Sequence, residues 1–125
     1  MRYLIDTHVL IWWMEGSNRL SENAYSLIND PTSQIFVSVA SVWEIVVKKA
    51  KKKLHLSQNI ERSIKSRGLS MLSIELAHVL ETGRLPLYHN DPFDRILIAQ
   101  ARVENSILIT SDPKIWKYNL KLIKA

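Results

Sequence analysis

The order of β-rich and helical segments along this chain is the feature that most restricts how it can fold. Five short apolar segments predict strands, and helical patterns fill the gaps between them. The expected strands cover residues 2–5, 35–38, 69–74, 107–110 and 120–123, and the expected helices cover residues 7–14, 21–30, 38–53, 59–67, 75–83 and 91–105. Because parallel strands need crossover connections, this alternation predicts an α/β fold, with helices on both faces of a parallel sheet of about five strands.

The size and composition indicate one soluble domain. A chain of 125 residues without internal repeats or flexible linkers is expected to form a single domain over residues 1–125. The absence of cysteine excludes disulfides, thiolate zinc sites and cysteine nucleophiles, and it favours a cytoplasmic location. The apolar N-terminal segment contains Asp6 and His8 and is too short to span a bilayer, so we expect no membrane contact.

The charge of the chain favours a polyanionic partner. Seventeen Lys and Arg residues against twelve Asp and Glu residues give a net charge of +5 and an isoelectric point of about 9.6. The densest basic run is "KKAKKK", residues 48–53, at the end of an expected helix. This run could contact phosphates, or it could be a solvated helix end where cations complement the helix dipole.

Two aspartates directly follow expected strands. Asp6 ends "RYLID" and Asp112 follows "ILITS". Ligands of open parallel sheets bind beyond the carboxyl ends of the strands, so both side chains are candidates for one site at that edge. Each aspartate could instead cap the helical segment that follows it, and Pro113 strengthens that alternative for Asp112.

Glu44 is an acidic residue that helix capping does not explain. It is the only charge between Val39 and Val47, in a helix that we expect to be largely buried. A buried carboxylate is costly unless it is paired, hydrogen-bonded or bound to a cation. The structural alternative is an ion pair with Lys48 four residues later, although such a pair contributes only about 0.2–0.5 kcal/mol.

The stretch "HNDPFDRILIAQA", residues 89–101, holds a further pair of aspartates ahead of an apolar run. Asp91 followed by Pro92 predicts an N-cap with proline at the first helical position. Asp94 is not needed for that cap. It is either an acidic first-turn residue favoured by the helix dipole or part of a site.

Asp6, Glu44, Asp94 and Asp112 thus come from four separated segments, all at or beside the carboxyl edge of the expected sheet. Four carboxylates would repel one another unless they surround a divalent cation, and Mg²⁺ or Mn²⁺ prefers such oxygen ligands. A centre of this kind can activate a water for attack on a phosphodiester. We therefore expect these four residues to be both the metal ligands and the catalytic residues.

The same residues resemble a known family, the PIN-domain ribonucleases, and within it the VapC-type toxins of bacterial toxin–antitoxin pairs. "YLIDTHVLIW" is similar to the family's opening strand and first acidic residue, and "SVASVWEI" to the helix that carries its glutamate. "DPFDRILIAQA" resembles the third acidic segment and "ILITSD" the fourth. The four motifs occur in order over nearly the whole chain.

The resemblance implies a PIN-like fold and a Mg²⁺- or Mn²⁺-dependent endoribonuclease. It also implies that Asp6, Glu44, Asp94 and Asp112 are the acidic quartet, with Thr110 and Ser111 as the hydroxyl-bearing approach to the last of them. The implied partners are an RNA substrate, a small VapB-like antitoxin wrapped around the toxin, and a second copy of the chain in a homodimer.

Two other functions remain as alternatives. "LIDTH", residues 4–8, resembles the nucleophile segment of haloacid-dehalogenase-like phosphatases, but His8 stands where that group needs a second aspartate. The second alternative is a non-catalytic PIN-like binding module, which gives no reason for a buried carboxylate at Glu44.

Histidine and tryptophan roles also stay open. His8 and His89 flank acidic residues, and they could contact substrate phosphate, act in proton transfer or make structural hydrogen bonds. Of Trp12 and Trp13, one could be exposed for a partner, or both could be partly buried in the core.

Overall fold

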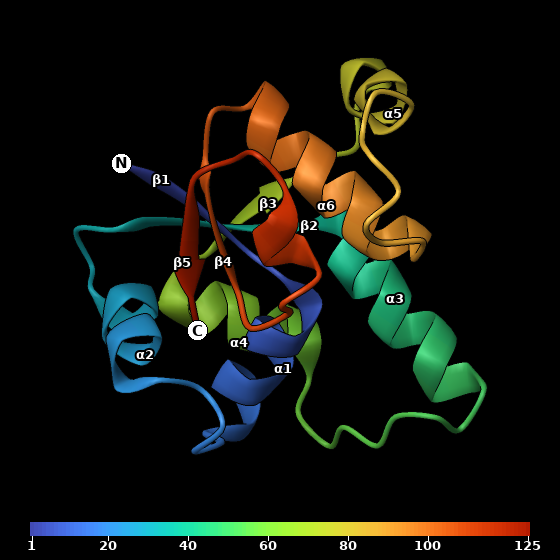
Figure 1. Ribbon diagram of the computed structural model, residues 1–125. Helices are drawn as coiled ribbons and strands as arrows, with labels where there is room; N and C mark the ends of the chain where they lie inside the picture. Colours follow the sequence, from blue (N-terminus) through green and yellow to red (C-terminus); the bar gives the residue numbers. More distant parts are fainter.

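A five-stranded parallel sheet forms the centre of the protein in the computed structural model, which describes residues 1–125 (Figure 1). The order of the strands across the sheet is β3-β2-β1-β4-β5, and all four pairings are parallel. The α/β fold expected from the sequence is therefore confirmed. The strands are β1 (Arg2–Ile5), β2 (Gln34–Ser38), β3 (Ser70–Leu72), β4 (Ile107–Thr110) and β5 (Leu122–Lys124).

Six α-helices connect the strands, and each overlaps one of the expected helical segments. None of them is both long enough and apolar enough to cross a membrane. Side chains of Ser21, Asn59 and Asp91 accept hydrogen bonds from first-turn N–H groups and explain where three of the helices begin. The helices are α1 (Thr7–Glu15), α2 (Glu22–Asn29), α3 (Val39–Ala50), α4 (Ile60–Arg67), α5 (Leu76–Thr82) and α6 (Pro92–Val103), with a short 3-10 helix, η1 (Ile115–Lys117), before β5.

The largest difference in helix length is at the end of α3. The basic run suggested a helix through Lys53, but α3 ends at Ala50. Lys52 has a left-handed backbone with a φ of 57°, which interrupts the helical hydrogen bonding. Repulsion among neighbouring lysines gives a physical reason for the earlier end.

The core is divided between the two faces of the sheet, because alternate residues of a strand point to opposite sides. Ile5 belongs to an apolar cluster with residues of α1, α2 and α4, whereas Leu4 belongs to a second cluster with residues of α6. In Figure 1, α1, α2 and α4 lie below the sheet and α6 lies above it. Burial on both faces explains why consecutive residues are apolar in these strands, Leu4 and Ile5 in β1 and Leu108 and Ile109 in β4.

The two edge strands differ from their expected extents. The segment expected at 69–74 pairs only over Ser70–Leu72, and the segment expected at 120–123 pairs over Leu122–Lys124. An edge strand has one neighbour, so its paired length depends on where that neighbour continues. Pairing of β3 stops where β2 ends and α3 begins, and composition alone does not reveal that point.

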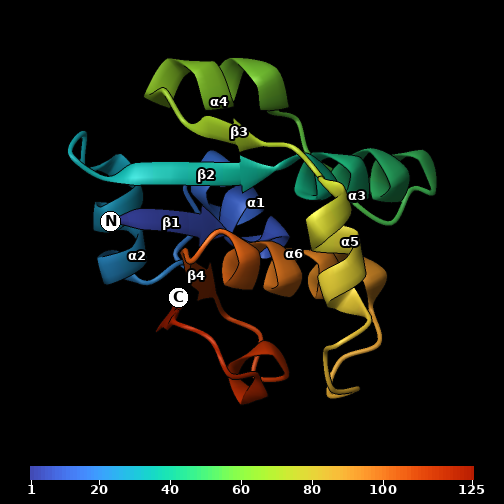
Figure 2. The same cartoon turned by 90° about the horizontal axis from the view of Figure 1, so that it is seen from above.

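The order of the strands reverses between β1 and β4. From β1 the chain moves outward to β2 and β3, then crosses to β4 on the other side of β1 and ends at β5. Ligands of open α/β sheets bind beyond the carboxyl ends of the strands at such a switch point. Figure 2 shows the arrowheads of β1 and β2 pointing toward the side where α3, α5 and α6 gather.

Candidate active site

Asp6 and Asp112 lie on either side of the switch point, because one follows β1 and the other follows β4. Thr110 joins them: its hydroxyl donates to Asp6 Oδ2 over 2.5 Å and accepts the N–H of Asp112 over 3.1 Å. Each aspartate also caps a turn, since Asp6 Oδ1 accepts the N–H of Val9 and Asp112 Oδ1 accepts the N–H of Lys114. Each aspartate therefore caps the turn that follows it and also lies at the carboxyl edge of the sheet, so the two alternatives from the sequence do not exclude each other.

Glu44 faces the same region from α3 and is only 2% exposed. Its Oε1 accepts a hydrogen bond of 2.6 Å from the hydroxyl of Thr7, the residue after Asp6. Its Oε2 lies 2.5 Å from Lys48 Nζ, so the ion pair considered from the sequence is formed. The buried charge is thus compensated by one cation and one hydroxyl, which satisfies the requirement set by its burial.

Asp94 and Asp91 have separate roles in the first turn of α6. Asp91 accepts the N–H groups of Phe93 and Asp94 at 2.8 and 3.3 Å, which confirms it as the N-cap. The Asp94 carboxylate makes no capping bond; its Oδ2 lies 3.0 Å from His89 Nε2. The same nitrogen lies 2.9 Å from Asp112 Oδ2. His89, Asp94 and Asp112 each offer one ligand atom within 4.8 Å of the others, a spacing that could hold a metal ion.

Charge crowding shows in the pKa of two carboxyl groups. Burial, followed by the negative charges of Asp91, Glu44, Asp6 and Asp112, raises the pKa of Asp94 to about 8. Burial also raises the pKa of Asp6, although hydrogen bonds from Thr110 and Val9 oppose it. All four predicted residues therefore lie close enough to interact electrostatically.

Lys48 is the cation that faces this acidic group. Burial by itself lowers the pKa of its ammonium group, but the hydrogen bond and charge of Glu44 outweigh that effect, so the pKa is raised. Asp91 and Asp94 contribute in the same direction. One ammonium group among several carboxylates leaves an excess of negative charge.

The donor set fits a hard divalent cation. Mg²⁺ and Mn²⁺ prefer oxygen ligands, and the residues that converge here supply carboxylate and hydroxyl oxygens without any thiolate. Burial and the neighbouring negative charges raise the pKa of Asp94 to about 8, and the nearby Lys48 does not offset them. A bound cation would supply the missing charge.

Several contacts at the site were not assigned from the sequence. Thr7 gave no signal, because only the fold brings its hydroxyl against Glu44, 37 positions later. His89 was left open between phosphate contact and structural hydrogen bonding, and the structure shows hydrogen bonds to the site itself. Its place two residues before the expected N-cap, Asp91, was the clue in the sequence.

The expectation that α3 is largely buried is wrong for one of its faces. Val39, Trp43 and Val46 are exposed, and Trp43 is 58% exposed. Trp12 and Trp13, by contrast, are both partly buried and pack on the core, as the second alternative from the sequence held. The residues of α1 pack on the core from more than one side, whereas Val39, Trp43 and Val46 of α3 lie outside both core clusters.

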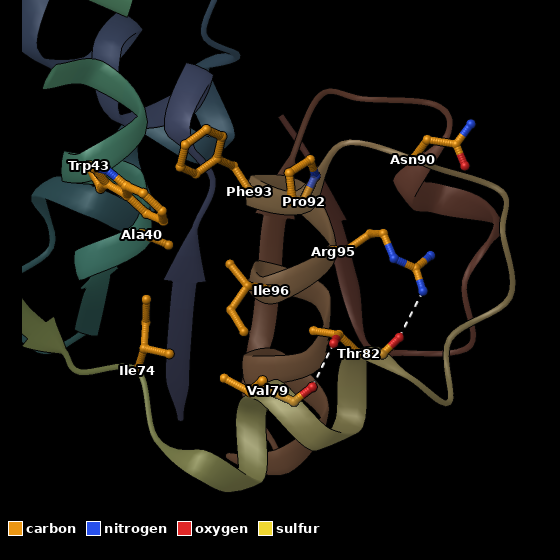
Figure 3. Close-up of a pocket in the computed structure, with 10 residues that line it drawn as sticks. All are labelled: Ala40, Trp43, Ile74, Val79, Thr82, Asn90, Pro92, Phe93, Arg95 and Ile96. Atoms are coloured by element: carbon orange, nitrogen blue, oxygen red, sulfur yellow. Dashed lines mark hydrogen bonds between the residues drawn. The ribbon is translucent and has the colours of Figure 1, made fainter. Parts of the chain in front are cut away.

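A groove lies beside the acidic residues without including them. It is about 480 Å³ and is lined by side chains of α3, α5 and α6, among them Trp43, Val79 and Phe93 (Figure 3). Trp43 and Phe93 meet edge to face with ring centroids 5.0 Å apart. These two residues directly precede Glu44 and Asp94, so the groove adjoins the acidic group through the backbone.

Fold and site together define an α/β protein with an acidic centre at the switch point of a parallel sheet. The PIN domain family model matches residues 3–119, and the chain belongs to this family. This result gives no support to the phosphatase alternative. A comparison with curated proteins finds no significant match.

Solved structures share the fold over almost the full chain. A chain of VapBC2 from Rickettsia felis, solved with a DNA fragment from the promoter, is 19% identical, with a TM-score of 0.67 and coverage of 99% of this chain and 98% of that one. A chain of DNA-bound VapBC from Salmonella typhimurium is 15% identical, with a TM-score of 0.71 and the same coverage. A chain of a toxin–antitoxin complex from Klebsiella pneumoniae is 19% identical, with a TM-score of 0.68 and coverage of 98% and 96%.

Proposed function

We propose that this protein is a divalent-metal-dependent endoribonuclease that acts as the toxin of a toxin–antitoxin pair. The observation that carries the proposal is the gathering of Asp6, Glu44, Asp94 and Asp112 at the switch point, with too little positive charge nearby. Membership of the PIN domain family and the basic composition support it. The proposal treats residues 1–125 as one PIN-like domain in the cytoplasm.

Asp6, Glu44, Asp94 and Asp112 are the residues proposed to hold Mg²⁺ or Mn²⁺, directly or through bound water. The cation would activate a water for attack on a phosphodiester and neutralise charge on the phosphoryl group. The chain itself orients the ligands: the Thr110 hydroxyl fixes Asp6 against Asp112. Thr7 and Lys48 hold both oxygens of Glu44 and so set its direction.

Protein partners would use an exposed apolar surface. Trp43 on α3 (58% exposed) and Val79 on α5 (50% exposed) both line the groove, and Leu76 and Leu80 on α5 are exposed as well. Exposed apolar side chains that cluster in this way are typical of protein interfaces. The similar solved chains come from toxin–antitoxin complexes, and we extend this to a VapB-like antitoxin and a homodimer here.

The direct test is incubation of the purified chain with RNA in the presence of Mg²⁺, with EDTA in a parallel sample. Cleavage that EDTA abolishes, and that Asp94→Asn also abolishes, is the expected result. Expression of the chain alone should arrest growth, and co-expression of its antitoxin should prevent the arrest. Intact RNA in every sample would refute the nuclease, whereas cleavage without growth arrest would refute the toxin role alone.

A non-catalytic PIN-like binding module is the second candidate. The observation in its favour is the pairing of Glu44 with Lys48 and Thr7, which satisfies this carboxylate without a metal. Such a module would bind RNA without cleaving it. Binding that survives in EDTA, with no cleavage in Mg²⁺, would support this alternative over the enzyme.

A further inference from the structure

The connection between α5 and α6 is held by an arginine from the first turn of α6. Arg95 donates hydrogen bonds to the carbonyl oxygens of Thr82, Leu85, Pro86 and His89, at 2.7, 3.2, 3.0 and 3.1 Å. Figure 3 shows the Arg95 side chain directed to Thr82. A single side chain thus binds four carbonyl groups along residues 82–89, which leaves this connection little freedom to move.

Tyr118, which follows η1, holds the same connection, and its hydroxyl lies 3.5 Å from Arg95 Nη1. Its buried hydroxyl accepts the N–H of His89 over 2.9 Å and donates to the carbonyl of Pro86 over 2.7 Å. The contacts of Arg95 and Tyr118 converge on His89, whose N–H and carbonyl are both engaged. The backbone of His89 is therefore fixed by residues that do not touch the acidic centre.

The imidazole of His89 is oriented by one further bond. Its Nδ1 accepts the N–H of Asp91 over 3.1 Å, which places the ring proton on Nε2. The Nε2–H is hydrogen-bonded to Asp112 Oδ2 at 2.9 Å, and Asp94 Oδ2 lies 3.0 Å from the same nitrogen. Asp91 consequently serves both the start of α6 and the direction of the imidazole.

We propose that His89 is a positioning residue of the acidic centre: its Nε2 group, hydrogen-bonded to Asp112 and in ion-pair contact with Asp94, forms a bridge that sets the separation of the two residues before a metal binds. The role of Arg95 and Tyr118 is to present His89 for this bridge. The inference rests on the proposed function, since it concerns the same site. It assigns His89 to orientation of ligands and not to proton transfer.

The physical reason is that Asp94 and Asp112 repel each other whenever both are ionised, which is the form in which both would bind a metal. Without a donor between them they would move apart, and the metal would have to bring them together at a cost in binding free energy. The bridge uses one oxygen of each carboxylate, and Asp94 Oδ1 has no hydrogen-bond donor in the fold. Hydrogen bonds to metal-binding carboxylates typically change metal affinity by about 10–100-fold when they are removed.

Two amide substitutions separate the two contacts of the imidazole, the Nδ1 acceptor for the Asp91 N–H and the Nε2 bridge. His89→Asn places an amide oxygen near the position of Nδ1, so it keeps the acceptor for the Asp91 N–H and loses the bridge. His89→Gln is longer by one methylene, so its amide N–H reaches the position of Nε2 and keeps the bridge. Mn²⁺ affinity, measured by calorimetry without RNA, should fall about tenfold or more in His89→Asn and stay close to wild type in His89→Gln.

Tyr118→Phe tests the proposal at a distance from the acidic residues. Loss of the hydroxyl releases the His89 N–H, so Mn²⁺ affinity should fall in the same direction as in His89→Asn. In the double variant the two losses should not add, because both act through one bridge. Additive losses would overturn the linkage between the connection and the bridge.

Other outcomes would overturn the proposal. Unchanged Mn²⁺ affinity in His89→Asn would show that the bridge has no positioning role, and tighter binding would show that the imidazole competes with the metal. A ¹⁵N spectrum of the metal-free protein should show a protonated Nε2 and an unprotonated Nδ1; the reverse tautomer would overturn the geometry.

These results are distinguishable from failure of the nuclease. If RNA is not cleaved but His89→Asn weakens Mn²⁺ binding, the positioning role stands and the proposed enzyme does not. If RNA is cleaved and His89→Asn binds Mn²⁺ as wild type does, the nuclease proposal stands and the positioning role of His89 does not. Absence of Mn²⁺ binding by the wild-type chain would overturn both.

Discussion

Substitution of Asp94 by asparagine gives the strongest prediction, because the fold raises the pKa of this carboxyl group from 3.8 to about 8. Between these pH values the folded state holds a proton that the unfolded state has lost. The free energy of unfolding of the metal-free protein therefore falls as pH rises through this window, by about 1.4 kcal/mol for each pH unit. Below the window both states are protonated, and above it both are ionised, so the slope disappears.

Asp94→Asn keeps the shape of the protonated carboxyl group and cannot ionise. The metal-free variant should match wild type near pH 4, exceed it by about 3 kcal/mol near pH 6, and exceed it by about 5 kcal/mol at and above pH 8. If Asp94 acts only on the helix dipole, the variant should instead lose about 0.3–1 kcal/mol at neutral pH. The two explanations differ in sign.

The assay is urea unfolding in EDTA from acid to alkaline pH, repeated with saturating Mg²⁺. Mg²⁺ should stabilise wild type strongly and the variant much less, and nuclease activity should fall by orders of magnitude. Asp30→Asn is the matched control, because hydrogen bonds from Thr32 lower the pKa of that exposed carboxyl group. Asp30 therefore contributes stability that is lost as pH falls, the opposite direction. Parallel pH profiles for wild type and Asp94→Asn would refute the reasoning.

Three further sets of variants test other parts of the site and surface. Lys48→Gln should lower the free energy of unfolding, measured by urea unfolding, by about 1–3 kcal/mol, because it removes the cationic partner of buried Glu44. Mg²⁺ should restore part of this loss. A loss of stability that Mg²⁺ leaves unchanged would contradict the prediction. Asp91→Ala should lower the free energy of unfolding by about 0.5–2 kcal/mol, because it removes the N-cap of α6. Asp91→Ser should keep the cap, and by removing a negative charge it should lower the pKa of Asp94. Equal stability of the two variants would argue against the capping role. Replacement of Lys49, Lys52 and Lys53 by glutamine should reduce the salt dependence of RNA binding by about 0.7 in log–log slope per lost phosphate contact, and an unchanged slope would leave the run as a solvated helix end. Glutamine at Lys114, Lys117 and Lys121 is the control for net charge.

The sequence predicted the features that depend on local signals. Strand and helix order follows from periodicity and from capping residues such as Asp91, and both are visible within one short segment. Glu44 was singled out because a lone charge in an apolar helix needs a partner, and the structure provides Lys48 and Thr7. The gathering of the four carboxylates followed from the rule that ligands bind at the carboxyl ends of parallel strands.

The features that the sequence did not predict depend on contacts between distant segments. The outer face of α3 carries Trp43, and apolar composition could not distinguish a buried face from an uncovered one. The position of His89 depends on Arg95 and on Tyr118, which lies 29 positions away from it. Edge-strand lengths depend on the partner strand, so β3 and β5 were the least accurately predicted strands.

The pairing of β1 with β4 also determines when the acidic centre can come into existence during synthesis. The hydrogen bond between Asp6 and Thr110 joins residues 104 positions apart, and Asp112 follows two residues later. At about 5–20 residues per second, the ribosome needs on the order of 5–20 s to proceed from Asp6 to Asp112. Throughout that interval the nascent chain has β1 without its neighbour β4, so the centre is incomplete. A complete acidic centre therefore arises only after Asp112 has emerged from the ribosome.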